Sequence, residues 1–103
     1  MPNQPYLRDT KESSDELLKS GNYAYAFYKA SDPETRACSR IMCGSIKAGL
    51  TELAACNGIS QYSSLIQAYG YWCLKKKNYA LEILSGIQSE KAKRFSEFIQ
   101  NGA

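Results

Sequence analysis

The chain contains no valine, and this absence limits the available folds more than any other feature of the sequence. Isoleucine and threonine, the other β-branched residues, together occupy only 10 of the 103 positions. β-Branched residues favour strands, whereas alanine, leucine, lysine and glutamate favour helices and occupy 36 positions. We therefore expect an all-α fold, and the length suits a single domain.

Turn and cap residues divide the sequence into six or seven short helices. Asp32-Pro33 is the strongest start signal, because aspartate caps a helix and proline suits its first position. Gly21, Gly58 and Gly86 are typical helix stops, and we expect another turn or kink at Ala48-Gly49. With caps at Asp9 or Thr10, Asn22, Asp32, Ser60 and Ser89, the expected helices span residues 9–20, 23–30, 33–48, 50–57, 60–76, 79–86 and 89–101.

One of these helices, over residues 60–76, carries an apolar stripe. At 100° per residue the stripe covers about one third of the helix circumference, which predicts that it belongs to the core. Tyr71 and Leu74 point away from it. The stripe consists of Tyr62, Leu65, Ile66, Tyr69, Trp72 and Cys73.

Three similar turns recur at intervals of 28 residues, around Gly21, Gly49 and Lys77. The first contains Gly21-Asn22-Tyr23 followed by Ala26, and the third combines Tyr69-Gly70 with Lys77-Asn78-Tyr79. These residues resemble the tetratricopeptide (TPR) repeat, although its length is about 34 residues and Glu82 stands where a small residue belongs.

The resemblance implies antiparallel helix pairs stacked as a right-handed superhelix. Residues 9–103 would form this TPR-like domain, with residues 89–101 as a C-terminal capping helix and residues 1–8 as a flexible lead-in. A compact helical bundle is the alternative fold.

The resemblance also implies a partner site on the outward face of the first helix of each pair. Tyr71 offers an apolar plate with a polar tip, and the basic residues favour an acidic protein or peptide. The expected partner-binding residues are Arg36, Ser39, Cys43, Lys47, Ser64, Gln67, Tyr71 and Lys75.

Catalysis is not expected, because the chain has no histidine to activate a nucleophile and no phosphate-binding glycine loop. Without histidine or a C-x-x-C pair, the four cysteines predict no metal site, and we expect no cofactor. We expect reduced packing cysteines, no secretory signal and a cytoplasmic location. Disulfides, a four-thiolate metal site or a redox role are the alternatives for the cysteines. The function expected is that of a non-catalytic scaffold or adaptor, either stand-alone or as the N-terminal interaction domain of a larger protein.

The net charge of +3 is too small for a general nucleic-acid surface. Local clusters at Lys75–Lys77 and Lys91–Arg94 nevertheless keep an alternative open, a small basic helical bundle that self-associates or binds nucleic acid. A homo-oligomer also stays open. No membrane association is expected, because the uncharged stretch Leu53–Leu74 is rich in Ser, Asn and Gln and interrupted by Gly58.

Overall fold

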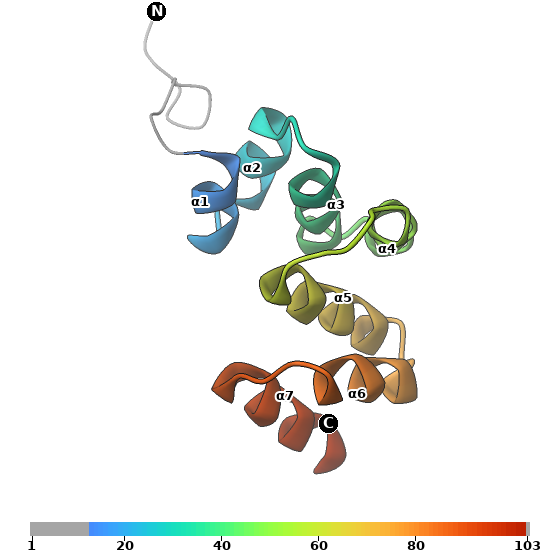
Figure 1. Cartoon of the computed structure of the whole chain (residues 1–103). Helices are drawn as coiled ribbons and strands as arrows, with labels where there is room; N and C mark the ends of the chain where they lie inside the picture. Colours follow the sequence, from blue (N-terminus) through green and yellow to red (C-terminus); the bar gives the residue numbers. More distant parts are fainter. Residues whose placement is uncertain (1–12, 103) are drawn as a thin grey trace, which may run out of the picture.

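The computed structural model describes residues 13–102, which form seven α-helices and no β-strand (Figure 1). The all-α prediction is therefore confirmed for this part of the chain. The expected lead-in at residues 1–8 and the expected cap at Asp9 or Thr10 lie outside it. The helices are α1 (Ser14–Lys19), α2 (Tyr23–Lys29), α3 (Pro33–Met42), α4 (Ile46–Ala54), α5 (Gln61–Cys73), α6 (Lys77–Ser85) and α7 (Glu90–Gln100).

The helices begin in two alternating ways. Odd-numbered helices start with a side-chain cap, in which Ser13, Asp32, Ser60 or Ser89 accepts a hydrogen bond from a backbone N–H three residues on. Three of these caps were predicted. The fourth, Ser13, shares a reciprocal capping box with Glu16, so α1 begins later than the sequence suggested. Even-numbered helices have no side-chain cap, and Asn22 makes no cap bond.

The even-numbered helices instead follow three copies of one tight turn. Gly21, Gly44 and Lys75 have positive φ values of 90°, 104° and 64°. The next residues, Asn22, Ser45 and Lys76, have ψ values of 65°, 66° and 67°. Each turn also repeats the hydrogen bonds of the Schellman motif, for example Lys75 N to Trp72 O and Lys76 N to Tyr71 O. The chain therefore folds as three pairs, α1–α2, α3–α4 and α5–α6, followed by α7.

The turn predicted at Ala48-Gly49 is wrong, because Gly49 lies inside α4. A Cβ atom added there would lie 2.5 Å from Ile41 Cγ1 and 2.9 Å from the Ala37 carbonyl oxygen, so this glycine lets α4 approach α3 closely. Its position, four residues after the turn residue Ser45, is occupied by Ala26 in α2 and by Ala80 in α6. Ala80, and not Glu82, is thus the small residue of the third pair.

The pairs stack in a row that measures 50 × 27 × 23 Å (Figure 1). Each helix contacts its neighbours in sequence, and α3 also contacts both α1 and α5. The buried apolar side chains form two clusters. The N-terminal cluster contains Leu17, Leu18, Tyr25, Ala26, Ala37, Cys38, Ile41, Leu50, Leu53 and Ile66. The C-terminal cluster contains Ala68, Ala80, Leu84, Ile87, Ala92 and Ile99.

A polar contact ties α3 to the start of α5. The Glu34 carboxylate accepts a 2.9 Å hydrogen bond from the Ser60 backbone N–H and another from the Ser63 hydroxyl. These bonds hold the pKa of Glu34 below its ordinary value, and the bond from Ser63 has the largest effect. The second and third pairs are therefore joined by a charged hydrogen-bond acceptor as well as by apolar packing.

Helix α5 buries two opposite strips of its surface. Gly70 faces Leu50 and Ile41, while Ala68, about 200° away around the helix, belongs to the C-terminal cluster with Ala80. The prediction that one stripe of α5 forms the core is therefore confirmed only in part, because Ile66 is buried while most of the other members pack against the clusters from partly exposed positions. Tyr62, Leu65, Tyr69, Trp72 and Cys73 are only partly buried.

Candidate functional site

Of the eight residues predicted to bind a partner, seven lie at least partly on the surface. Ser39 is the exception, with no exposed area, and its hydroxyl donates a 2.8 Å hydrogen bond to the Thr35 carbonyl oxygen. The prediction for Ser39 is wrong, because α3 is covered on two sides by α4 and α5.

The other predicted residues do not all line one hollow. The Arg36 guanidinium lies 4.5 Å from the centre of the Phe27 ring, so it packs on α2. Cys43 is exposed at the end of α3, and Ser64 and Gln67 are partly exposed on α5. None of these four residues lines either of the hollows described next.

Lys47 and Tyr71 do come together, in a groove between α4 and the end of α5. We call it the α4–α5 groove, and its volume is about 690 Å³. Tyr71 packs against both apolar clusters, and its ring lies 5.4 Å from that of Tyr79. Less of its side chain is therefore open to a partner than predicted. The groove is lined by Lys47, Leu50, Thr51, Ala54, Tyr71, Leu74 and Lys76.

The groove combines an apolar surface with positive charge. Leu50, Ala54 and Leu74 supply the apolar part, and the exposed side chains of Lys47 and Lys76 supply the charge. Neither lysine forms an ion pair within the described chain, and no acidic residue lines the groove. The Lys76 ammonium lies 5.7 Å from the centre of the Tyr79 ring.

Sequence reasoning missed five of the groove residues, Leu50, Thr51, Ala54, Leu74 and Lys76. One signal for them existed, because Leu74 lies opposite the aromatic stripe of α5 and shares a side with Tyr71. An apolar residue on a helix face that is expected to be solvated indicates a second packed surface or a binding surface.

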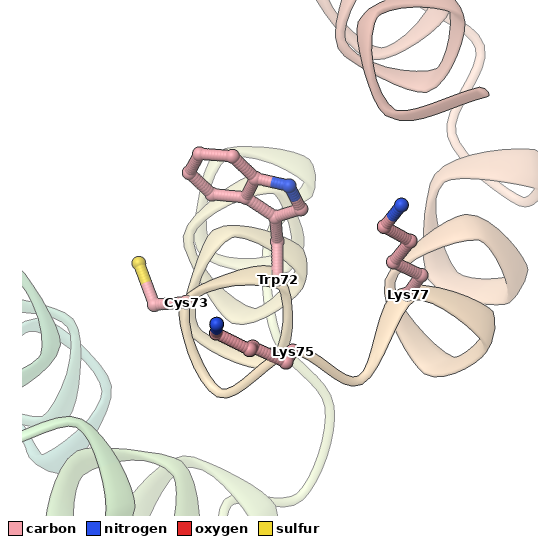
Figure 2. Close-up of a pocket in the computed structure, with 4 residues that line it drawn as sticks. All are labelled: Trp72, Cys73, Lys75 and Lys77. Atoms are coloured by element: carbon pink, nitrogen blue, oxygen red, sulfur yellow. The ribbon is translucent and has the colours of Figure 1, made fainter. Parts of the chain in front are cut away.

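Lys75 lines a second hollow, which we call the Trp72 pocket (Figure 2). Its volume is about 510 Å³, and its lining residues are Trp72, Cys73, Lys75 and Lys77. In Figure 2 the ring nitrogen of Trp72 is on the side of the indole that faces Lys77. The pocket and the groove share no lining residue.

The four cysteines are free thiols in different surroundings. Cys38 is fully buried, and burial raises the pKa of its thiol to about 11. The side chain of Cys73 forms a hydrogen bond with Tyr69 that raises the pKa of the tyrosine. Among residues 13–102, no group of three or more His, Cys, Asp or Glu side chains is placed to hold a metal ion.

Comparisons of the chain with protein-family models, with curated proteins and with solved structures find no match. Over the described helices, none is both long and apolar enough to cross a membrane.

Proposed function

We propose that this chain is a TPR-like scaffold, a right-handed superhelical stack of helix pairs that binds an acidic segment of a partner protein in the α4–α5 groove. It carries out no catalysis of its own and acts in the cytoplasm.

The repeated geometry of the three pairs supports a TPR-like stack. The same turn precedes α2, α4 and α6, and a small buried residue follows four positions after each turn. Contacts of α3 with both α1 and α5 are those expected when the first helices of successive pairs lie side by side. The inner side of such a stack would carry Tyr62 of α5, whose ring lies 5.6 Å from the Lys19 ammonium of α1.

The composition of the α4–α5 groove carries the proposal for the partner. An apolar floor selects a leucine-like or aromatic side chain, while Lys47 and Lys76, free of ion pairs within the described range, attract carboxylates on either side of it. The Thr51 hydroxyl donates to the Lys47 carbonyl oxygen and can still accept a hydrogen bond from the backbone of an extended peptide, which the Tyr71 hydroxyl can bind as well. An acidic segment with one apolar anchor satisfies all of these groups.

Selection from a random peptide library tests the proposal. The wild-type chain should enrich sequences in which Asp or Glu flank a Leu, Ile, Met or aromatic residue. A Lys47→Glu/Lys76→Glu variant should lose this enrichment, whereas Lys91→Glu, an exposed lysine on α7, should keep it. Enrichment of neutral or basic sequences, or equal enrichment by the double variant, would contradict the proposal.

The nucleic-acid alternative retains one supporting observation, the run Lys75–Lys77 beside the exposed ring of Tyr79. Titration with a labelled single-stranded oligonucleotide separates the two readings. Nucleic-acid binding should weaken steeply between about 50 and 200 mM salt, while binding of the selected peptide should change far less. Tight, salt-dependent oligonucleotide binding with no peptide selected would favour the alternative.

A further inference from the structure

The Trp72 pocket lies at the C-terminal end of α5, where the following turn leads into the start of α6 (Figure 2). Two of its four lining residues are lysines, and none is acidic. Lys75 and Lys77 form no ion pair with any residue from 13 to 102. The pocket therefore presents positive charge that the rest of the described chain leaves uncompensated.

The indole of Trp72 forms a fixed flat wall of this pocket. Phe95 and Phe98 of α7 meet it nearly edge-on, with ring centres at 5.9 and 5.7 Å, and Tyr69 lies at 6.1 Å. The ring is only partly buried, and its N–H group has no hydrogen-bond acceptor in the described part of the chain. The wall thus offers both an apolar surface and a free donor beside Lys77 (Figure 2).

Lys75 occupies a backbone position that does not require a lysine. Glycine stands at the equivalent places, Gly21 and Gly44, because φ is positive in all three turns. Hydrogen bonds on both sides of the residue, from Lys75 N to Trp72 O and from Lys76 N to Tyr71 O, fix the backbone that carries this ammonium group. The turn therefore places a charged side chain at the pocket in a conformation that lysine rarely adopts.

We propose that the Trp72 pocket is a second binding site, distinct from the α4–α5 groove, for a flat apolar ring that bears an anionic group. The ring lies against the indole of Trp72, and the anion is held by Lys77 together with the indole N–H, while Lys75 adds positive charge on the Cys73 side of the pocket. A carboxylate and a phosphate share this chemistry, so the site takes an aromatic acid of either kind.

Trp72 is the only tryptophan of the chain, so its fluorescence reports on this pocket alone. Titration with phenyl phosphate and with phenylacetate should each give a saturable change in emission, and the tighter of the two identifies the preferred anion. Phenol, which lacks the charge, and inorganic phosphate, which lacks the ring, should each bind at least about tenfold more weakly. Equal affinity for phenol and phenyl phosphate, or no saturable change with either acid, would overturn the proposal.

Variants assign the response to the pocket. Lys77→Gln should weaken the tighter acid by about tenfold, whereas Lys91→Gln, on the exposed surface of α7, should leave its affinity unchanged. If Lys77→Gln and Lys91→Gln alter the affinity equally, the charge acts non-specifically and the site is wrong. The peptide selection uses different residues, so either result can fail without the other.

Discussion

The two apolar clusters of this chain are built by different means. In the N-terminal cluster, Leu17, Ile41 and Leu53 are each 1% exposed, and the Gly49 backbone lies directly against α3. In the C-terminal cluster three of the six buried residues are alanines, and the partly buried rings of Trp72 and Phe95 pack against the cluster. Separate tyrosines such as Tyr62 and Tyr69 also pack against the first cluster, whereas Trp72, Phe95 and Phe98 form one group of touching rings at the second.

The arrangement of these rings bears on where binding surfaces can form. Each cluster leaves aromatic side chains at the surface, and Tyr28, which is 76% exposed, lies 6.3 Å from the ring of Tyr25 at the N-terminal cluster. Phe98 is 54% exposed and Tyr79 57% exposed, both beside the C-terminal cluster. The Trp72 pocket lies at the group of touching rings, and the α4–α5 groove lies where Tyr71 contacts both clusters.

Truncation of one large side chain in each cluster is the strongest test of this contrast. Ile41→Ala should cost about 3–4 kcal/mol, because Ile41 is fully buried between α4 and α5. Trp72→Ala removes a larger side chain but one that is partly in solvent, so we expect only about 2 kcal/mol. Urea denaturation measures both, and an equal or greater loss for Trp72→Ala would show that the group of touching rings is true core.

Two glycines test how closely the helices of the N-terminal cluster approach. Gly49→Ala should cost about 2 kcal/mol even after the gain in helix propensity, since the new methyl group meets backbone atoms of α3 at 2.9 Å. Gly70→Ala should change stability by no more than about 1 kcal/mol, because its nearest neighbour is the flexible end of Leu50, at 3.1 Å. Thermal unfolding compares them, and equal effects would mean that α3 and α4 are further apart than described.

Side-chain caps and composition were the parts of this fold that sequence could predict. Asp32, Ser60 and Ser89 bond their helices locally, so a few adjacent residues determine them. Gly49 was wrongly assigned to a turn, because glycine suits both a turn and a close contact between two helices. The turn at Lys75 was missed because a lysine in a sequence does not indicate a positive φ. The third turn was therefore predicted at Lys77, two residues too late.

The candidate site was harder to predict for a related reason. An amphipathic pattern assumes one buried face, but α5 is packed on two opposite sides and open on the two between. The aromatic stripe and the Tyr71 side therefore both remain partly exposed, and only the fold decides which neighbours complete each surface. Lys47 reaches the groove from another helix, which spacing along α5 cannot reveal.

The contact between α3 and α5 should make the N-terminal cluster sensitive to acid. Because hydrogen bonds hold the pKa of Glu34 below 4.5, the folded chain binds fewer protons than the unfolded chain, and this stabilisation is present above pH 4.5 and lost as the pH falls through the lowered pKa. Glu34→Gln should cost about 1 kcal/mol at neutral pH and nothing once the pH lies well below the lowered pKa of Glu34.

Urea titrations at several pH values measure this dependence. Glu82→Gln is the control, since Glu82 is exposed on α6 and its carboxylate has no hydrogen bond or ion pair within residues 13–102. A cost for Glu34→Gln that stays constant with pH would mean that its carboxylate does not bond to Ser60 and Ser63.

The smallest expected effect concerns the turn that joins the two clusters. Lys75→Gly should raise stability by about 0.5–1 kcal/mol, because glycine adopts a φ of 64° without the strain that a Cβ atom brings. Gly44→Lys is the matched exchange, and it should lower stability by about 1–2 kcal/mol although nothing lies within 4 Å of the added Cβ atom. If Lys75→Gly is also weaker in binding aromatic acids at the Trp72 pocket, stability and binding are opposed at this one residue. A loss of stability in Lys75→Gly would instead mean that the lysine side chain supports the turn, and the equivalence of the three turns would not hold.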